Sequence, residues 1–475
     1  MEKTAPTRLR QIRVGAARRG SESHNVKEYE RFRANLLLKC PAHLWPKGSY
    51  RAVCPHPILI TEDHWRQAME LSEALTTAIT DIVDRWWSDP QARFFERMPL
   101  KREEEDLLRW LEDQVSRGRL KKYFACPGSW RPDFLIEDRA RSQNELAGEN
   151  FLITEINGRF PFNGAVHIAY AQEALEDMNL GSFNPASTTA PAQIFDGLRS
   201  LFNPSVPLHL LIGEEAGMDI HMLIDGAKER LGIVPRLINP SDLRLEPDLR
   251  GNGGYRLCCL SQKNGDVRMS PSPRTFINSA GETVEEIQQV GLELHQHELF
   301  GLPRDMLRQL SLCCFNDLRT ILLVHDKRML GIVKQELQEL VRAQVLTPDQ
   351  ARVLDEGIVD TFIPDSPQLR SLLETSIYSL TLKDEYVLKP IRSGKGLQSE
   401  AACLENMYVV QRKVKHSLYD LVLHASGEKL HYPLVGTWHI MDGRFCGFGA
   451  WRSSAGRICA ISSGGSIVCS VSENH

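Results

Sequence analysis

Two short stretches in the first third of the chain carry side chains that could hold a metal ion beside a phosphate. The first contains Arg131 and Asp133, and the second contains Glu155 and Asn157. In each stretch apolar residues alternate with polar ones, which predicts two β-strands joined by a loop. If these strands pair antiparallel, Glu155 and Asn157 point to one face and Asp133 can lie opposite them.

Asp133, Glu155 and Asn157 would together supply two carboxylates and an amide oxygen. These donors suit Mg²⁺, which binds one or two carboxylates and completes its shell with water and substrate phosphates. Arg131 points the same way as Asp133 and would add a permanent positive charge where phosphate gathers. The same residues also fit the solvent-facing side of an edge strand, so the two stretches alone leave both interpretations open.

Length and composition limit the class of protein. A chain of 475 residues is long enough for about three lobes. The charged fraction of 25% is ordinary for a globular protein, and the net charge of -4 argues against nucleic acid as the main partner. No apolar run is long enough to span a membrane, and the eleven cysteines include no Cys-x-x-Cys pair. We therefore expect a cytoplasmic protein with reduced thiols that binds neither nucleic acid nor membranes.

Changes in pattern predict four regions. Residues 1–25 are rich in arginine and predict a basic flexible arm. Residues 26–195 contain the first helices and the metal-binding strands. Residues 196–300 open with a strand, a helix and a strand, the order of a βαβ unit, which predicts a separate α/β lobe that binds substrate. Residues 301–475 are expected to complete the core and to supply a lid with a glycine loop.

Two other groups of polar residues are explained by secondary structure alone. The acidic run from Glu103 to Asp106 predicts the solvated first turn of a helix. His295 and His297 alternate with polar residues, which indicates one face of a strand over residues 293–298. We assign neither group a metal.

The last third of the chain carries a lysine that ends an apolar strand. Lys389 runs into a short loop that contains Ser393, Gly394 and Gly396. Small residues let backbone N–H groups approach phosphate oxygens, and Lys389 would add a point charge beside them. The P-loop pattern is absent. A second strand over residues 408–414 has a polar break, and its backbone could read the edge of an adenine.

Two more cations are expected at the ends of elements. A helix should begin near Asp326, which places Lys327 at its N-terminus. A hairpin with a turn at Asp442 and Gly443 should lead to Arg452.

Taken together, these stretches resemble the circularly permuted ATP-grasp ligases, the group of eukaryotic glutathione synthetase and glutathionylspermidine synthetase. In that family an Arg-x-Asp strand precedes a Glu-x-Asn strand, here Arg131-Pro132-Asp133 and Glu155-Ile156-Asn157. A lysine at a helix start, a Lys-Pro strand with a glycine loop, a hinge strand and a late arginine then follow in the same order as here. The order of these elements is more specific than any one of them.

The resemblance implies an α/β fold of the ATP-grasp type, circularly permuted, with a smaller Rossmann-like lobe. It also implies ATP and Mg²⁺ as cofactors. The implied roles are metal binding by Asp133, Glu155 and Asn157, nucleotide binding by Lys327, Lys389, Ser393, Gly394, Gly396, Gln411, Arg412, Lys413 and Val414, and catalysis by Arg131 and Arg452. We further expect Arg159 and Asn163 to line the substrate pocket.

The implied activity is an ADP-forming ligation that joins a small-molecule carboxylic acid to an amine through an acyl phosphate. The sequence departs from the family at Ser393, where glutathione synthetase has a glutamate, and Glu400 is a candidate replacement for that metal ligand. The alternative is therefore a nucleotide-binding protein of the same fold that has lost ligase activity. The identity of the acid and of the amine stays open, and a homodimer is compatible with the sequence.

Overall fold

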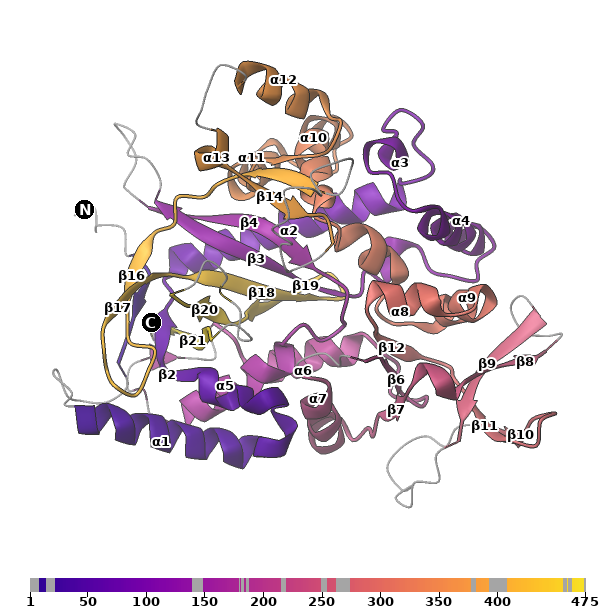
Figure 1. The fold of residues 1–475 in the computed structure, drawn as a ribbon, viewed down its shortest axis with the longest axis horizontal. Helices are drawn as coiled ribbons and strands as arrows, with labels where there is room; N and C mark the ends of the chain where they lie inside the picture. The colour runs from indigo at the N-terminus through magenta and orange to yellow at the C-terminus, as the bar shows by residue number, and fades with distance from the viewer. Residues whose placement is uncertain are drawn as a thin grey trace.

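The fold is built around one large sheet (Figure 1). A computed structural model describes residues 8–13, 22–138, 148–178, 180, 183–184, 188–214, 219–248, 254–261, 274–376, 382–392, 408–455, 459 and 464–473. Side by side, the main strands of the sheet are β1 (Arg10–Gln11), β2 (Val53–Leu59), β21 (Ser466–Glu473), β20 (Trp451–Ser453), β18 (Val435–Met441), β3 (Ser129–Asp138) and β4 (Glu149–Asn157). Two more strands pair at the side of this path, β19 (Arg444–Phe448) with β18 and β5 (Phe183–Asn184) with β21.

Helices cover both faces of the large sheet because its strands are apolar on both sides. In β21, Val468 packs into one hydrophobic cluster, whereas Ile467 and Cys469 pack into another. Successive strand residues point to opposite faces, so the two clusters lie on opposite sides of the sheet. The first cluster contains α2 (Glu62–Asp84), and the second contains α5 (Ala165–Glu176).

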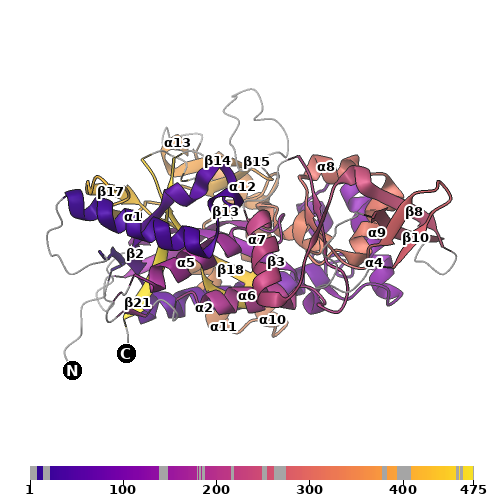
Figure 2. The ribbon, with the colours of Figure 1, turned by 90° about the horizontal axis from the view of Figure 1, so that it is seen from below.

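The other helices surround this core. In Figure 2, α1, α5, α6 and α7 lie in front of the large sheet. The remaining helices are α1 (Glu22–Lys39), α3 (Phe94–Arg97), α4 (Arg102–Ser116), α6 (Pro191–Ser200), α7 (Ile220–Gly226), α8 (Gln296–Gly301), α9 (Arg304–Cys313), α10 (Arg328–Arg342), α11 (Pro348–Gly357), α12 (Pro367–Ser376) and α13 (Leu382–Glu385).

The pairing of β3 with β4 is antiparallel, as predicted, and it contains a β-bulge. Asp133 lies opposite Glu155, but the next residue of β3, Phe134, lies opposite Ile153. Thr154 is therefore the extra residue. A bulge of this kind reverses which face the following residues point to. It turns Glu155 away from the core that holds Ile153 and Phe134.

The predicted βαβ unit is present in the lobe that follows. Strand β6 (His209–Ile212) pairs in parallel with β7 (Arg236–Ile238) on one side and with β12 (Val290–Glu293) on the other. A second sheet has the order β10 (Thr275–Ile277), β11 (Thr283–Glu286), β9 (Tyr255–Leu260) and β8 (Leu243–Pro247), and it forms the right-hand end of the molecule in Figures 1 and 2.

The strand predicted over residues 293–298 is wrong in most of its length. Strand β12 ends at Glu293, and α8 begins at Gln296. His295 is the N-cap of α8, and its backbone N–H donates to Glu298 Oε2 at 2.7 Å. This capping arrangement starts a helix where the polar alternation had suggested a strand.

A buried polar cluster ties the two sheets of the lobe together. His209 Nε2 lies 3.0 Å from Glu285 Oε1, and Cys259 Sγ lies 3.7 Å from the same oxygen. Arg236 forms an ion pair with the other oxygen of Glu285. Arg236 balances the carboxylate, so the cluster is an ion-paired contact between strands, although the buried Nδ1 of His209 has no hydrogen-bond partner among the described residues.

A small three-stranded sheet covers the edge of β4. Its order is β13 (Thr361–Phe362), β15 (Tyr408–Arg412) and β14 (Tyr386–Pro390), all antiparallel, so the strands predicted around Lys389 and over residues 408–414 are both present. We call it the lid sheet. In the register, Lys389 pairs with Val409 and Gln411 pairs with Thr361, which puts these residues on the face toward β4. A hairpin of β16 (Leu418–Leu421) and β17 (Leu430–Pro433) follows.

The arm predicted to be flexible over residues 1–25 is structured in part. Strand β1 pairs with β2, and helix α1 begins at Glu22. Beside β1, the backbone N–H of Leu9 donates to Glu149 Oε2 at 2.8 Å, and Arg8 Nε donates to Glu149 Oε1 at 3.0 Å. A buried carboxylate at the start of β4 therefore anchors this part of the arm. The four-region division itself stays a prediction.

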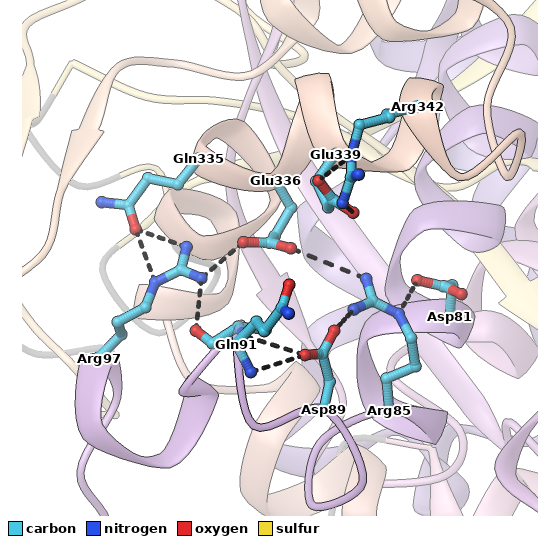
Figure 3. A network of polar contacts seen from close by, with 10 residues as sticks. Asp81, Arg85, Asp89, Gln91, Arg97, Gln335, Glu336, Glu339 and Arg342 are labelled. Carbon is cyan, nitrogen blue, oxygen red and sulfur yellow. Dashed lines mark hydrogen bonds and ion pairs between the residues drawn. The ribbon is translucent and has the colours of Figure 1, made fainter.

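An ion-pair network holds α10 against α2 and α3 (Figure 3). Glu336 of α10 is buried and accepts a hydrogen bond from Arg97, while its other oxygen lies 3.7 Å from Arg85. Arg85 also pairs with Asp81 and Asp89. The network matters for the site because α10 begins directly after Lys327.

The helices and the cysteines of the structure bear on two expectations from the composition. No helix in the described part of the chain is both long and apolar enough to cross a bilayer. The described cysteines are free thiols, as predicted from their spacing.

Candidate active site

The centre of the site is a carboxylate held between two arginines. Arg131 Nε donates to Asp133 Oδ1 at 3.0 Å, and Arg452 of β20 donates to the other oxygen. Asp133 is buried. Burial alone would raise the pKa of its carboxyl, but Arg131 and Arg452 outweigh burial and lower that pKa. The structure thus brings Arg452 to a pair of residues, Arg131 and Asp133, that lie more than three hundred positions earlier in the sequence.

Beside this centre, Glu155 and Asn157 share one face of β4, as predicted. Glu155 Oε2 lies 3.3 Å from Lys327 Nζ. Lys327 is the N-cap residue of α10, which confirms the expected helix start. The buried amide nitrogen of Asn157 has no hydrogen-bond partner among the described residues, so this side chain is not committed to the protein's own structure.

The lid sheet approaches β4 at the bulge. Lys389 Nζ donates to the carbonyl oxygen of Thr154 at 3.5 Å, and Gln411 Nε2 donates to the same oxygen at 3.0 Å. Burial lowers the pKa of Lys389, the neighbouring Lys327 lowers it further, and Glu155 opposes both effects. Two cations from different elements, Lys327 and Lys389, therefore lie close enough to Glu155 and to each other to interact electrostatically.

The predicted hinge residues have different environments. Arg412 forms a bidentate ion pair with Glu137, with both N–O distances 3.0 Å. The backbone N–H of Arg412 donates to Asp360, and that of Lys413 donates to Glu385. Val414 packs against Leu152 and Val359, and its N–H has no acceptor within the described ranges. The side chain of Gln411 is buried and donates also to Thr361.

The predicted glycine loop cannot be placed. Ser393, Gly394, Gly396 and the candidate replacement ligand Glu400 all fall outside the described residues. Their assignments stay predictions from the sequence.

Arg159 lies where β4 leaves the large sheet and meets the lobe. It contacts His295, at the start of α8, and His325, just before α10. It also donates to the backbone carbonyl of Arg392 at 2.9 Å. The backbone at Gly158 passes close to Thr320, because a Cβ at Gly158 would lie 3.1 Å from the side chain of Thr320. Only glycine fits there without a shift of its neighbours.

Asn163 occupies a turn with a left-handed backbone, at φ 49°. Its side-chain amide donates to the carbonyl of Phe160 at 2.5 Å, and its own carbonyl accepts from Arg131 Nη1 at 2.7 Å. Asn163 therefore stabilises the turn and orients Arg131. Its predicted contact with substrate stays a prediction.

Two residues of the site, His325 and Glu104, were not predicted from the sequence. His325 lies next to the site and was not singled out, although it precedes Lys327 by only two positions. Glu104 was assigned to a solvated turn, and this is wrong, because Glu104 is fully buried and forms an ion pair with Arg392. The spacing gave a signal, since Glu104 lies on the same helical stripe as the buried Leu108 and Leu111.

Positive charge exceeds negative charge in this region. Asp133 is shared by two arginines, and Lys327 has Glu155, while Arg392 has Glu104 and Asp326. Lys389 and Arg159 form no ion pair with any carboxylate that the structure describes. Both side chains are partly buried, and a cation that is partly removed from water without a counter-ion is costly, so the arrangement favours the binding of anions.

Comparisons with known proteins agree with this geometry. A family model described as the AnkG N-terminal domain matches residues 71–323, more than half of the chain. The ATP-grasp enzyme ankG of Aspergillus thermomutatus is 34% identical over 430 residues, which covers 86% of each chain. The solved structure of a glutathione synthetase-like effector from Globodera pallida, in its apo form, has a TM-score of 0.53 at 10% identity and covers 95% of this chain and 98% of that one. That last likeness concerns the fold alone. The predicted ATP-grasp fold is thereby confirmed, and the chain belongs to the AnkG family of ATP-grasp enzymes.

Proposed function

We propose that the protein is an ADP-forming ligase that joins a carboxylic acid to an amine. The observation that carries the proposal is the group of cations around Glu155 and Asn157. Lys327, Lys389 and Arg131 come from three separate elements and converge on two oxygen-bearing side chains. A triphosphate bound to a divalent cation keeps a net negative charge, which would balance these positively charged side chains.

The donor set fits Mg²⁺. Glu155 brings a carboxylate and Asn157 an amide oxygen to the same face of β4, and the amide nitrogen of Asn157 has no hydrogen-bond partner among the described residues. These two residues would hold the ion, with phosphate oxygens and water completing its shell. When bound, Mg²⁺ would supply charge neutralisation on the phosphates. Asp133 remains a predicted ligand, although in this structure both its oxygens accept hydrogen bonds from arginines.

The fit to ATP rests on the lid sheet. Lys389 and Lys327 would bind the phosphates, and Lys389 would exchange its long contact with the Thr154 carbonyl for a phosphate oxygen. The N–H of Val414 would donate to the adenine, since the preceding N–H groups of Arg412 and Lys413 already have acceptors.

In the proposed reaction, a carboxylate oxygen of the acid attacks the γ-phosphorus of ATP, and ADP leaves. The amine nitrogen then attacks the acyl carbon, loses a proton and displaces inorganic phosphate. The first step brings two anions together, so preorganised positive charge must supply most of the stabilisation. Arg131 and Arg452, held in place by Asp133, are the residues positioned to provide it.

The test is ADP release that depends on both an acid and an amine. Acid and amine pairs are screened with Mg²⁺ and ATP, with Glu155→Ala as the inactive control. We expect at least one pair to give ADP and phosphate in equal amounts with the wild type only. Release that ignores the acid, or that survives Glu155→Ala, would contradict the proposal.

A second candidate is a nucleotide-binding protein of the same fold that has lost ligation. It is favoured by Ser393, which stands where glutathione synthetase has a glutamate. The two candidates differ in turnover, because such a protein would bind ATP but release no ADP in response to any acid and amine. Replacement of Ser393 by glutamate would then raise ADP release if the missing ligand were the cause.

A further inference from the structure

Arg159 is held by acceptors that carry no negative charge. Its Nη1 lies 3.0 Å from His295 Nδ1, and its Nη2 lies 3.1 Å from His325 Nε2. Its third acceptor is the backbone carbonyl of Arg392, at 2.9 Å. The guanidinium is thus fixed in orientation from three segments, but none of these contacts neutralises it.

His325 stays neutral beside Arg159. Burial lowers the pKa of His325 to about 3, and the charges of Arg159 and Lys327 add to this effect. Its Nδ1 lies 3.2 Å from the carbonyl of Ile156, which accepts the ring N–H and leaves Nε2 as the acceptor for Arg159. His325 therefore orients the guanidinium without balancing its charge.

The other arginines of the site differ from Arg159 in this respect. Arg131 and Arg452 share Asp133, and Arg392 has both Asp326 and Glu104. Arg159 forms no ion pair within the described residues. Its Nε and one hydrogen of Nη1 also have no acceptor there.

Position separates Arg159 from the phosphate-binding lysines. Lys389 reaches the bulge from the lid sheet, whereas Arg159 reaches His295, at the junction of β12 and α8 in the α/β lobe. Through Nη2, Arg159 also contacts His325, which precedes Lys327 by two positions. An anion bound at Arg159 would therefore lie next to the α/β lobe, at the junction of β12 and α8.

We propose that Arg159 binds a carboxylate of a substrate other than the carboxylate that is activated. This proposal rests on the proposed ligase function, and it narrows the substrate class: one substrate carries a second, non-reacting carboxylate. A planar guanidinium matches a carboxylate with two parallel hydrogen bonds. The carboxylate could belong to a dicarboxylic acid or to an amino acid that serves as the amine, and the experiment distinguishes the two.

The test measures binding by calorimetry in the presence of Mg²⁺ and a non-hydrolysable ATP analogue. One arm compares succinate, glutarate, malate and tricarballylate with their monoamides. The other compares glycine, aspartate and glutamate with their α-carboxamides. We expect one arm to contain a carboxylate that binds at least tenfold more tightly than its amide, and that arm identifies the source.

Variants connect this preference to Arg159. Arg159→Gln should reduce the preference to less than about threefold, and Arg159→Lys should keep part of it because the charge remains without the fork. Arg244→Gln is the control, since Arg244 is a partly exposed arginine of the α/β lobe that pairs with Glu282. If Arg159→Gln does not unfold cooperatively on heating, Arg159→Lys carries the comparison.

Two results would overturn the inference: no carboxylate probe binds the wild type more tightly than its amide, or the preference survives in Arg159→Gln. Both results come from binding measurements and do not require that the protein turns over ATP. A carboxylate preference without any ADP release would instead count against the proposed function. ADP release without a carboxylate preference would leave the function standing and remove the role of Arg159.

Discussion

Asp133 accepts a hydrogen bond from an arginine on each of its oxygens, and this fixes both guanidinium groups before any substrate arrives. Such preorganisation is what a site needs when charge develops during the reaction. It also explains why Asp133 is charged in spite of its burial, since the two arginines outweigh the cost of removing it from water.

Arg131 is the residue whose loss should affect turnover most directly. We expect Arg131→Ala to lower kcat at least about a hundredfold, corresponding to roughly 3 kcal/mol of transition-state stabilisation. The thermal unfolding midpoint should change little, because Arg452 would still balance Asp133. Steady-state ADP release and a melting curve check the two parts, and near-normal turnover in a folded variant would remove Arg131 from the mechanism.

We expect Asp219 to make the stability of the protein depend on pH. It is buried, and burial raises its pKa to about 6 from an ordinary 3.8, although it accepts the N–H of Val166. Because the folded pKa is raised, its contribution is complete below about pH 4 and is lost as the pH rises through about 6. The loss is roughly 3 kcal/mol.

The variant that isolates this contribution is Asp219→Asn. Urea unfolding at pH 4.5 and 7.5 should show that the wild type loses more stability than the variant over this interval. The side-chain carbonyl of the variant can still accept from Val166. Identical pH dependence in the two proteins would mean that Asp219 ionises normally.

At the scale of elements, the bulge in β4 determines what the site contains. The sequence predicts correctly that Glu155 and Asn157 share a face, because they are two positions apart. It does not predict which face, since the extra residue at Thr154 depends on pairing with β3 and on the two lid-sheet donors at its carbonyl. Long-range contacts of this kind leave no local pattern.

Helix starts also differ in how well the sequence predicts them. The start of α10 was predictable because Asp326 and Lys327 interrupt an apolar run. The start of α8 was not, because His295 is a rare cap and its polar neighbours also fit a strand. Glu104 was misassigned because an acidic first turn normally faces water, whereas here it meets Arg392 from the far end of the chain.

The network in Figure 3 supplies a test of how α10 is held. We expect Glu336→Gln to lower the free energy of unfolding by roughly 2–3 kcal/mol, since it removes the charge that Arg97 contacts while Arg85 keeps Asp81 and Asp89. Glu339→Gln, on the exposed side of the same helix, is the control and should leave that energy unchanged. Chemical denaturation of both variants measures the difference. Equal effects would show that the buried pair of Glu336 and Arg97 stabilises the protein no more than the exposed pair of Glu339 and Arg342.

At the scale of the whole molecule, the site joins three parts of the chain. The large sheet supplies Asp133 and Glu155, the lid sheet supplies Lys389, and the lobe supplies the contact to Arg159. The order of the motifs predicted this assembly through the family resemblance. The charge balance could not be predicted, because it depends on which arginines have carboxylates nearby in space.

The excess of positive charge in the site should destabilise the protein when no nucleotide is bound. We expect Lys389→Met to leave the protein without ligand at least as stable as the wild type, because it removes a partly buried cation whose only described polar contact is a long one. The same variant should lose most of the stabilisation by Mg²⁺ and ATP, which is about 2.7 kcal/mol for the wild type at a hundred times Kd. Thermal shifts with and without nucleotide check both parts, and a wild-type shift in the variant would exclude Lys389 from nucleotide binding.

The extra residue at Thr154 also bears on how relatives of this protein should be compared. A chain that lacked one residue between the positions of Phe151 and Glu155 could still pair its two strands, but the acidic and amide side chains would then be turned into the apolar interior. Such a deletion would hardly change the sequence identity between two relatives. An alignment should therefore be checked for a residue at the position of Thr154, because homologues without it would keep the fold but not the face that Glu155 and Asn157 share.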